Sequence, residues 1–449
     1  MDTISAIYGT FWHSKDLHTL ECLQDTLLRL NRDGKICGIE REYKRADALK
    51  LDPATTWIVP EGSIVLPGFV DTHTHAPQYP NLGLGHGLPL LEWLDKLTFP
   101  TEAKFSDEAY AREEYRKLVQ ATLAGGTTTC CYYSSIHLGA SKVLADLAIE
   151  FGQRVFVGKC NMDRQETCPS YYVESSAEIS LQETRLFIDH CRRLDPTGEK
   201  VCPIVTPRFA LGCTKELLDS LGQLAREEGL PIQTHVSENV QEIEQTKALY
   251  GSNYVEVYQS SGLLTDRTIL AHAVHLTADE IKCVRQADSG LAHCPSSNFN
   301  LGSGICPVRH LLQSGLRVGL GTDLSAGHNV SILEEMKCAR QASMVIGMGV
   351  GGGMPKGTPT DPTAQTVLSL ENLFYMATLG GASLCRLDHL IGSFTLGKAF
   401  DAVQVTLEDT PHHQPGDRLE RFLSTGHPCQ IIHVWIGGRR RYSKGAASV

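Results

Sequence analysis

Hydrophobic and polar residues alternate along the chain in two different patterns. The first 65 residues form short apolar runs, and the turn sequence Asn31-Arg32-Asp33-Gly34 between residues 26–30 and 35–39 predicts a β-hairpin. From about residue 66 to residue 390, short apolar runs are followed by longer segments with helical spacing. Strand-like runs return at 402–405 and 431–436. We therefore expect the two chain ends to pair in one small β-sandwich.

The central region contains eight apolar runs that are typical of buried strands. Strands that alternate with helices predict a parallel sheet, and eight of them are the number that closes a barrel. An open, doubly wound sheet would show the same alternation, and periodicity alone does not separate the two folds. The eight runs are 64–70, 127–133, 154–160, 201–207, 231–235, 268–272, 290–294 and 317–321.

The expected fold class is α/β, with three sequence segments in two domains. Residues 66–390 would form a (β/α)8 TIM-type barrel, while residues 1–65 and 391–449 would form the two parts of the small β-sandwich. The helix at 107–123 illustrates the connecting segments. We expect Ser106 to cap its N-terminus, and Gly125 and Gly126 to follow its end.

Charge and composition exclude several classes of function. The chain has 41 Lys and Arg residues against 51 Asp and Glu residues, a net charge of −10, and no long basic run, so we expect no nucleic-acid partner. No run of 18 apolar residues predicts a membrane span. Residues 1–10 contain no Lys or Arg, and the 15 cysteines include no Cys-x-x-Cys pattern. These features favour a cytoplasmic protein.

The most informative motif is a pair of histidines at the end of the first central strand. His73 and His75 are two residues apart, so their side chains would point to the same side of a strand. Further metal-type residues end later strands: His235, His272 and Asp323. In a closed barrel these positions meet at the C-terminal face, where barrel enzymes keep their active sites. Imidazole and carboxylate groups suit Zn²⁺, and the same ligands suit iron.

Glu238 lies three residues after His235. A solvated loop acid is an equally simple interpretation of its position. However, hydrolysis at a metal requires a group that moves protons between water and the leaving group, and a carboxylate can do this. Glu238 is therefore the candidate proton shuttle.

These residues resemble the pattern of the amidohydrolase superfamily, which has His-x-His on strand one, histidines on strands five and six, and Asp on strand eight. Within the superfamily the chain is similar to the branch that deaminates guanine. The resemblance covers nearly the whole chain, and its matching stretches are 67–79, 89–94, 151–159, 206–209, 235–239 and 292–295.

The resemblance implies a role for each matching residue. The implied metal ligands are His73, His75, His235 and Asp323; the catalytic residues are Glu238, His272 and Asp323; the substrate contacts are Gln78, Trp93, Arg208 and Phe209. It implies the hydrolysis of guanine to xanthine and ammonia by metal-activated water, a step of purine breakdown. The fourth strand has no Lys to bridge two metals, so one Zn²⁺ per subunit is expected. Pro77 stands where the vertebrate members of this branch have Ser.

Two other functions fit parts of the pattern. A related hydrolase could act on another aminopurine, a triazine or a cyclic amide with the same metal ligands. A scaffold that kept the barrel without catalysis is a second alternative, but such proteins usually lose metal ligands. Guanine and water are thus the expected substrates, and the resemblance also implies a homodimer.

Overall fold

The computed structural model describes residues 3–349, 367–407 and 415–445. Its strands are β1 (Ala6–Ser14), β2 (Leu20–Leu30), β3 (Ile36–Glu40), β4 (Thr56–Ile58), β5 (Ser63–Pro67), β6 (Phe69–His75), β7 (Thr127–Tyr133), β8 (Arg154–Gly158), β9 (Cys160–Asn161), β10 (Val201–Pro203), β11 (Thr206–Pro207), β12 (Ile232–Val236), β13 (Thr268–His272), β14 (Gly290–His293), β15 (Arg317–Leu320), β16 (Ala402–Thr406), β17 (Ile431–Ile436) and β18 (Arg439–Ser443).

The helices occupy most of the connections between the parallel strands. They are α1 (Arg45–Ala48), α2 (Leu90–Trp93), α3 (Phe99–Glu102), α4 (Glu108–Ala124), α5 (Leu138–Phe151), α6 (Ala177–Leu194), α7 (Lys215–Glu228), α8 (Val240–Tyr250), α9 (Tyr254–Ser260), α10 (Ala278–Gln286), α11 (Pro295–Asn300), α12 (Val308–Gln313), α13 (Ile332–Gly347), α14 (Leu370–Ala377), α15 (Leu379–Leu384) and α16 (Pro415–Thr425). Short 3-10 or π turns are η1 (Ala76–Asn81), η2 (Leu94–Thr98), η3 (Ala103–Ser106), η4 (Ala210–Gly212) and η5 (Pro428–Gln430).

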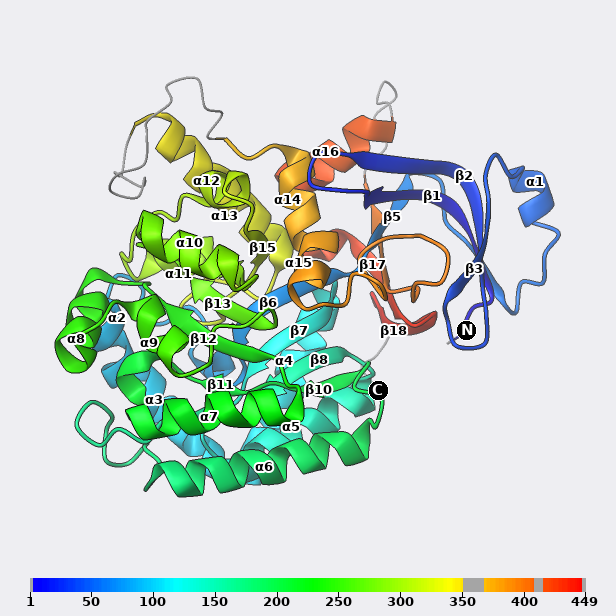
Figure 1. The fold of residues 1–449 in the computed structure, drawn as a ribbon. Helices are drawn as coiled ribbons and strands as arrows, with labels where there is room; N and C mark the ends of the chain where they lie inside the picture. Colours follow the sequence, from blue (N-terminus) through cyan, green and yellow to red (C-terminus); the bar gives the residue numbers. More distant parts are fainter. Residues whose placement is uncertain (1–2, 350–366, 408–414, 446–449) are drawn as a thin grey trace.

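The two chain ends share one eight-stranded sheet. Its order is β18-β17-β16-β5-β1-β2-β3, with β4 paired to β1. Strand β16 pairs antiparallel with β5, so the C-terminal part joins the N-terminal part directly. Figure 1 shows these strands at one end of the molecule, beside the parallel strands and their helices. The pairing of the ends agrees with the sequence pattern, although the strands form one sheet rather than two separate sheets.

The parallel strands belong to three sheets, in the orders β10-β8-β7-β6, β11-β9 and β12-β13-β14-β15. Among the described residues, backbone pairing therefore does not trace one closed barrel of eight strands. The breaks lie in the third and fourth predicted strands, at Lys159 between β8 and β9 and at Ile204 and Val205 between β10 and β11. Strand β15 still lies beside β6, because Thr72 Oγ1 donates to Leu320 O at 2.8 Å.

Two details of the predicted elements were wrong. The predicted strand 64–70 is two strands, because Gly68 separates β5 of the eight-stranded sheet from β6 of the parallel region. Asp107, not Ser106, caps helix α4, since its side chain accepts from the backbone N–H groups of Ala109 and Tyr110. Ser106 instead ends the preceding 3-10 turn η3.

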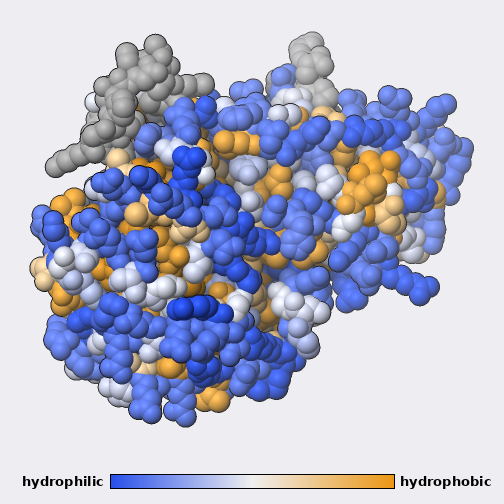
Figure 2. Space-filling model, in the orientation of Figure 1, coloured by the Kyte–Doolittle hydropathy of each residue, from blue (hydrophilic) through white to orange (hydrophobic). Residues whose placement is uncertain are grey.

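A large hydrophobic core joins the two regions. One face of the eight-stranded sheet contributes Leu66 and Val403, which belong to the same buried cluster as Leu270 of β13 and Met336 of α13. The opposite face packs its own cluster around Phe11 and other buried side chains. Figure 2 shows mainly hydrophilic residues on the visible surface, with hydrophobic residues scattered among them. No helix within the described ranges has the length and hydropathy needed to cross a bilayer.

The junction between β5 and β6 provides a test of this packing. A Cβ atom at Gly68 would lie 2.1 Å from Oγ1 of the buried Thr128. We expect Gly68→Ala to lower the free energy of unfolding by about 1–3 kcal/mol, because overpacking forces neighbouring atoms apart. Thermal denaturation followed by circular dichroism would measure the loss.

A matched control is Gly416→Ala in helix α16, where Trp12, at 4.0 Å, is the one described side chain that the added Cβ would approach. Alanine is favoured over glycine within helices by about 1 kcal/mol, so this change should not lower the melting temperature. An equal melting temperature for Gly68→Ala and the parent would contradict the packing argument.

Candidate metal centre and active site

Four predicted ligands meet at the ends of the parallel strands. His73 and His75 lie on β6, His235 lies on β12, and Asp323 follows β15. One ligand atom from each lies within 4.8 Å of the others, and all four side chains are buried. Asp323 Oδ1 is 3.2 Å from His73 Nε2 and 3.6 Å from His75 Nε2. The structure thus brings together residues separated by about 250 positions in sequence.

Backbone geometry at the strand ends sets this arrangement. Asp323 N donates to His73 O at 2.9 Å, which holds the segment after β15 against β6. Asp323, His272 and Ser237 have positive φ angles of 42°, 71° and 47°. Such conformations cost non-glycine residues about 1–3 kcal/mol each and gather at functional sites.

Asp71 supports the two chain segments that carry His73 and Asp323. The sequence analysis did not identify it. Its Oδ1 accepts from the backbone N–H of His73 at 3.2 Å and of Thr322 at 3.1 Å. Its Oδ2 accepts from Thr322 Oγ1 at 2.5 Å. Asp71 therefore ties together the two segments that carry His73 and Asp323. Its position directly before Thr72-His73 is the sequence feature that could have identified it.

The nitrogens of the cluster fit a bound cation. His75 Nε2 and His235 Nε2 are 3.0 Å apart, and burial holds the pKa of both imidazoles well below its ordinary value. Both rings are therefore neutral and can offer lone pairs. His235 Nδ1 lies 2.5 Å from Arg208 O, which favours a proton on Nδ1 and leaves Nε2 free. His73 Nε2 is buried and forms no well-aligned hydrogen bond with any described residue, although Asp323 Oδ1 lies 3.2 Å away. Three imidazoles and one carboxylate suit zinc or iron.

Lys159 does not add a second metal ligand to this cluster. Its buried ammonium group forms ion pairs with Glu174 and, at 3.5 Å, with Glu183. These two acidic partners explain how the Lys159 side chain can be buried without a metal beside it.

Glu238 and His272 face the ligands from neighbouring strand ends. Glu238 Oε2 is 3.5 Å from His272 Nε2, and its Oε1 accepts from Ser303 Oγ at 3.2 Å. Burial and then the charge of Asp323 raise the pKa of Glu238 to about 8, so its carboxyl group holds a proton at neutral pH. His272 Nδ1 lies 3.0 Å from Asn298 Oδ1. Ser303 and Asn298 lie in loop and helix segments that carried no motif to identify them.

A buried pocket adjoins the cluster. It contains the four predicted substrate contacts, Gln78, Trp93, Arg208 and Phe209, together with apolar and acidic residues. Its lining is His75, Gln78, Leu90, Trp93, Leu94, Arg208, Phe209, His235, Glu238, Glu242, Leu301, Asp323 and Ala326. The pocket therefore combines flat apolar walls, a guanidinium group, an amide and a carboxyl group that can hold a proton.

Glu102 is another buried acid that the sequence analysis missed. It forms two hydrogen bonds with Arg208, at 2.6 and 2.9 Å. Burial lowers the pKa of Arg208, but the charge and hydrogen bonds of Glu102, together with other nearby groups, raise this pKa overall. Glu102 ends the short helix α3, where no spacing or motif distinguishes it from a surface acid.

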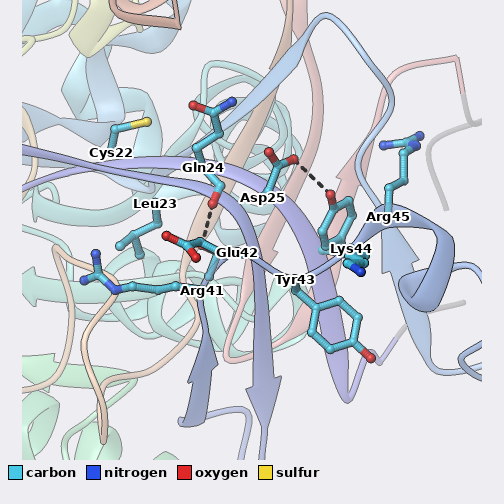
Figure 3. A pocket seen from close by; sticks show the side chains of 11 residues that line it. Cys22, Leu23, Gln24, Asp25, Arg41, Glu42, Tyr43, Lys44 and Arg45 are labelled. Carbon is cyan, nitrogen blue, oxygen red and sulfur yellow. Dashed lines mark hydrogen bonds between the residues drawn. The ribbon is translucent and has the colours of Figure 1, made fainter.

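A second hollow lies on the eight-stranded sheet, away from these residues. Figure 3 shows Asp25, Arg41, Lys44 and Arg45 among the side chains around it. The Tyr8 hydroxyl donates to Asp25 at 2.9 Å. This hollow is open, its charges are mixed, and it contains none of the metal-type histidines.

Comparisons with known proteins agree with this geometry. The sequence model of the amidohydrolase family matches residues 64–441. A guanine deaminase from Dictyostelium discoideum is 42% identical, with 97% of this chain and 98% of that protein aligned. A guanine deaminase from Homo sapiens is 38% identical, over 96% of this chain and 95% of that protein.

Solved structures give the same relationship. A crystal structure of guanine deaminase from C. acetobutylicum with bound guanine has a TM-score of 0.87 and 33% identity, covering 97% of this chain and 99% of that one. The family and its solved members imply a TIM-barrel-type fold with mixed α/β content. This chain belongs to the amidohydrolase family and, within that family, to the guanine deaminases.

Proposed function

We propose that this chain hydrolyses guanine to xanthine and ammonia. The main support for this proposal is that Gln78, Arg208 and Phe209 line the same pocket as Glu238 and the histidines His75 and His235. The relatives support it, because proteins named guanine deaminase align over nearly the whole chain and one solved relative holds guanine in its active site.

His73, His75, His235 and Asp323 would hold one Zn²⁺ per subunit, and iron suits the same donors. A bound metal of this kind lowers the pKa of water to about 7 and so supplies a nucleophile at neutral pH. The donor set supports this role because one ligand atom from each of the four side chains lies within 4.8 Å of the others, and the imidazoles of His75 and His235 are neutral.

Two side chains would transfer protons, and a third would stabilise the new oxygen. Glu238, which holds a proton at neutral pH, would donate it to the ring nitrogen beside C2 of guanine and so weaken the ring bond under attack. Asp323 would accept a proton from the attacking water, and His272 would stabilise the new oxygen at C2. Glu238, now deprotonated, would take the proton of the new hydroxyl group at C2 and pass it to the amino group, which leaves as ammonia, and the proton held by Asp323 would return to Glu238.

Binding and orientation are assigned to the rest of the pocket. Arg208 would donate to the purine oxygen, Gln78 would bind a ring nitrogen, and Phe209 and Trp93 would form apolar walls. The pocket is buried, so these contacts would be made away from bulk water.

The detailed fold, the oligomeric state and the location of the protein are proposed on the same basis. The parallel strands would complete a (β/α)8 barrel over residues 66–390, and the eight-stranded sheet would form a small separate β domain from residues 1–65 and 391–449. A homodimer and a cytoplasmic location are predictions from the family resemblance and the composition.

The activity itself can be measured directly. We expect metal-loaded protein to convert guanine to equal amounts of xanthine and ammonia, followed by ultraviolet absorbance and an ammonia assay. A panel of other aminopurines, a triazine and a cyclic amide should be turned over less efficiently. Turnover of another compound in the panel without turnover of guanine would reject the assignment.

Glu238→Gln should lower kcat by at least about 100-fold, because an amide cannot move the proton, while bound metal is retained. Steady-state kinetics and metal analysis on the same sample would check both results. Glu244→Gln is the matched control, since Glu244 is exposed on helix α8, which begins two residues after Glu238. Activity within tenfold of the parent would contradict the role of Glu238.

His73→Ala should reduce metal content to well below one ion per subunit, because it removes one of four ligands. His190→Ala is the control, since His190 pairs with Asp146 at 2.8 Å outside the site. Elemental analysis after gel filtration would compare the two variants. Full metal occupancy in His73→Ala would remove this histidine from the ligand set.

A further inference from the structure

The carboxylate of Glu102 is fully buried and is bound by three neighbouring side chains. Arg208 Nη1 donates to Oε2 at 2.6 Å, and Arg208 Nη2 donates to Oε1 at 2.9 Å. Gln78 Nε2 donates to Oε1 at 2.9 Å, and the Tyr172 hydroxyl donates to Oε2 at 2.6 Å. A carboxylate has about four acceptor sites, so these four donors occupy all of them.

This network determines which way the amide of Gln78 faces. An ionised carboxylate only accepts hydrogen bonds, so the nitrogen of Gln78 must point toward Glu102. The reversed amide would place its oxygen against Oε1 at about the same 2.9 Å distance, with no proton between the two oxygens. Gln78 Oε1 therefore faces away from Glu102, and it is buried without a hydrogen-bond partner among the described residues.

The pocket consequently has a defined pattern of donors and acceptors. Gln78 and Arg208 both line it, and both bind the same oxygen of Glu102. The Arg208 guanidinium, which stacks on Phe99 with Cζ 5.3 Å from the ring centre, offers donors only. Gln78 Oε1 offers an acceptor that needs a donor from a bound molecule, because a buried acceptor without a partner costs free energy.

We propose that Glu102 is a positioning residue that sets base specificity by fixing Gln78 as an acceptor beside the donors of Arg208. This inference rests on the proposed function. The pattern selects purines with a ring N–H beside a carbonyl oxygen, as in guanine. It rejects purines with an unprotonated ring nitrogen beside an amino group, because donor would face donor and acceptor would face acceptor.

Binding of two purines that lack the reacting amino group tests the proposal. Hypoxanthine has the N–H and carbonyl pair, and adenine has the reversed pair. Calorimetry on the metal-loaded, full-length parent should give a dissociation constant at least about tenfold lower for hypoxanthine than for adenine. In Glu102→Gln that preference should fall at least tenfold, because an amide at this position can donate to Gln78 and allow its amide to reverse.

Gln78→Ala provides a second variant that keeps the ion pair between Glu102 and Arg208. It should reduce the preference for hypoxanthine by a similar factor, and adding Glu102→Gln to it should change the preference less than twofold. Glu174→Gln is the matched control, because Glu174 is a buried acid paired with Lys159 outside the pocket lining. This control should leave the preference unchanged.

Three results would overturn the proposal. They are equal weakening of both purines by Glu102→Gln, an unchanged preference in Gln78→Ala, and an undiminished effect of Glu102→Gln in the Gln78→Ala background. Guanine turnover by the parent decides the proposed function separately. A parent that shows the binding preference but no turnover would reject the activity and keep the role of Glu102.

Discussion

The meeting of the β6 and β15 ends is the constraint on which the candidate site depends. Asp323 N donates to His73 O, and Asp71 accepts from the backbone N–H groups of His73 and Thr322. These bonds bring a carboxylate beside two imidazoles that come from the opposite end of the barrel sequence. They hold the metal-type side chains of the two segments within reach of one another.

Burial gives the site its chemical character. It keeps His75 and His235 neutral by lowering the pKa of each, and it raises the pKa of Glu238 so that this acid holds a proton. The same burial makes every unpaired polar atom costly, so the pocket residues need partners. Glu102 provides one for Arg208, while Gln78 Oε1 has no hydrogen-bond partner among the described residues.

The two regions of the fold depend on each other for their cores. Strands β5 and β16 bring the chain ends together, and one face of their sheet belongs to the same hydrophobic cluster as the parallel strands. Gly68 lies at the point where the chain leaves one sheet for the other, with the side chain of Thr128 against it. The eight-stranded sheet thus helps to hold the start of β6, which carries His73 and His75.

The sequence by itself determined the strand-and-helix alternation, the His73/His75 pair and the residues that end later strands, because these depend on local spacing. It also identified the pocket residues Gln78, Arg208 and Phe209, through family resemblance. The predicted strand 64–70 began too early for β6. An unbroken apolar run does not reveal that residues 64–67 belong to a separate strand that pairs with β16. Only the tertiary structure decided the roles of Asp71, Asn298, Ser303 and Glu102. Their partners are distant in sequence or reached through a turn, and a hydrogen bond between side chains leaves no periodicity in the chain.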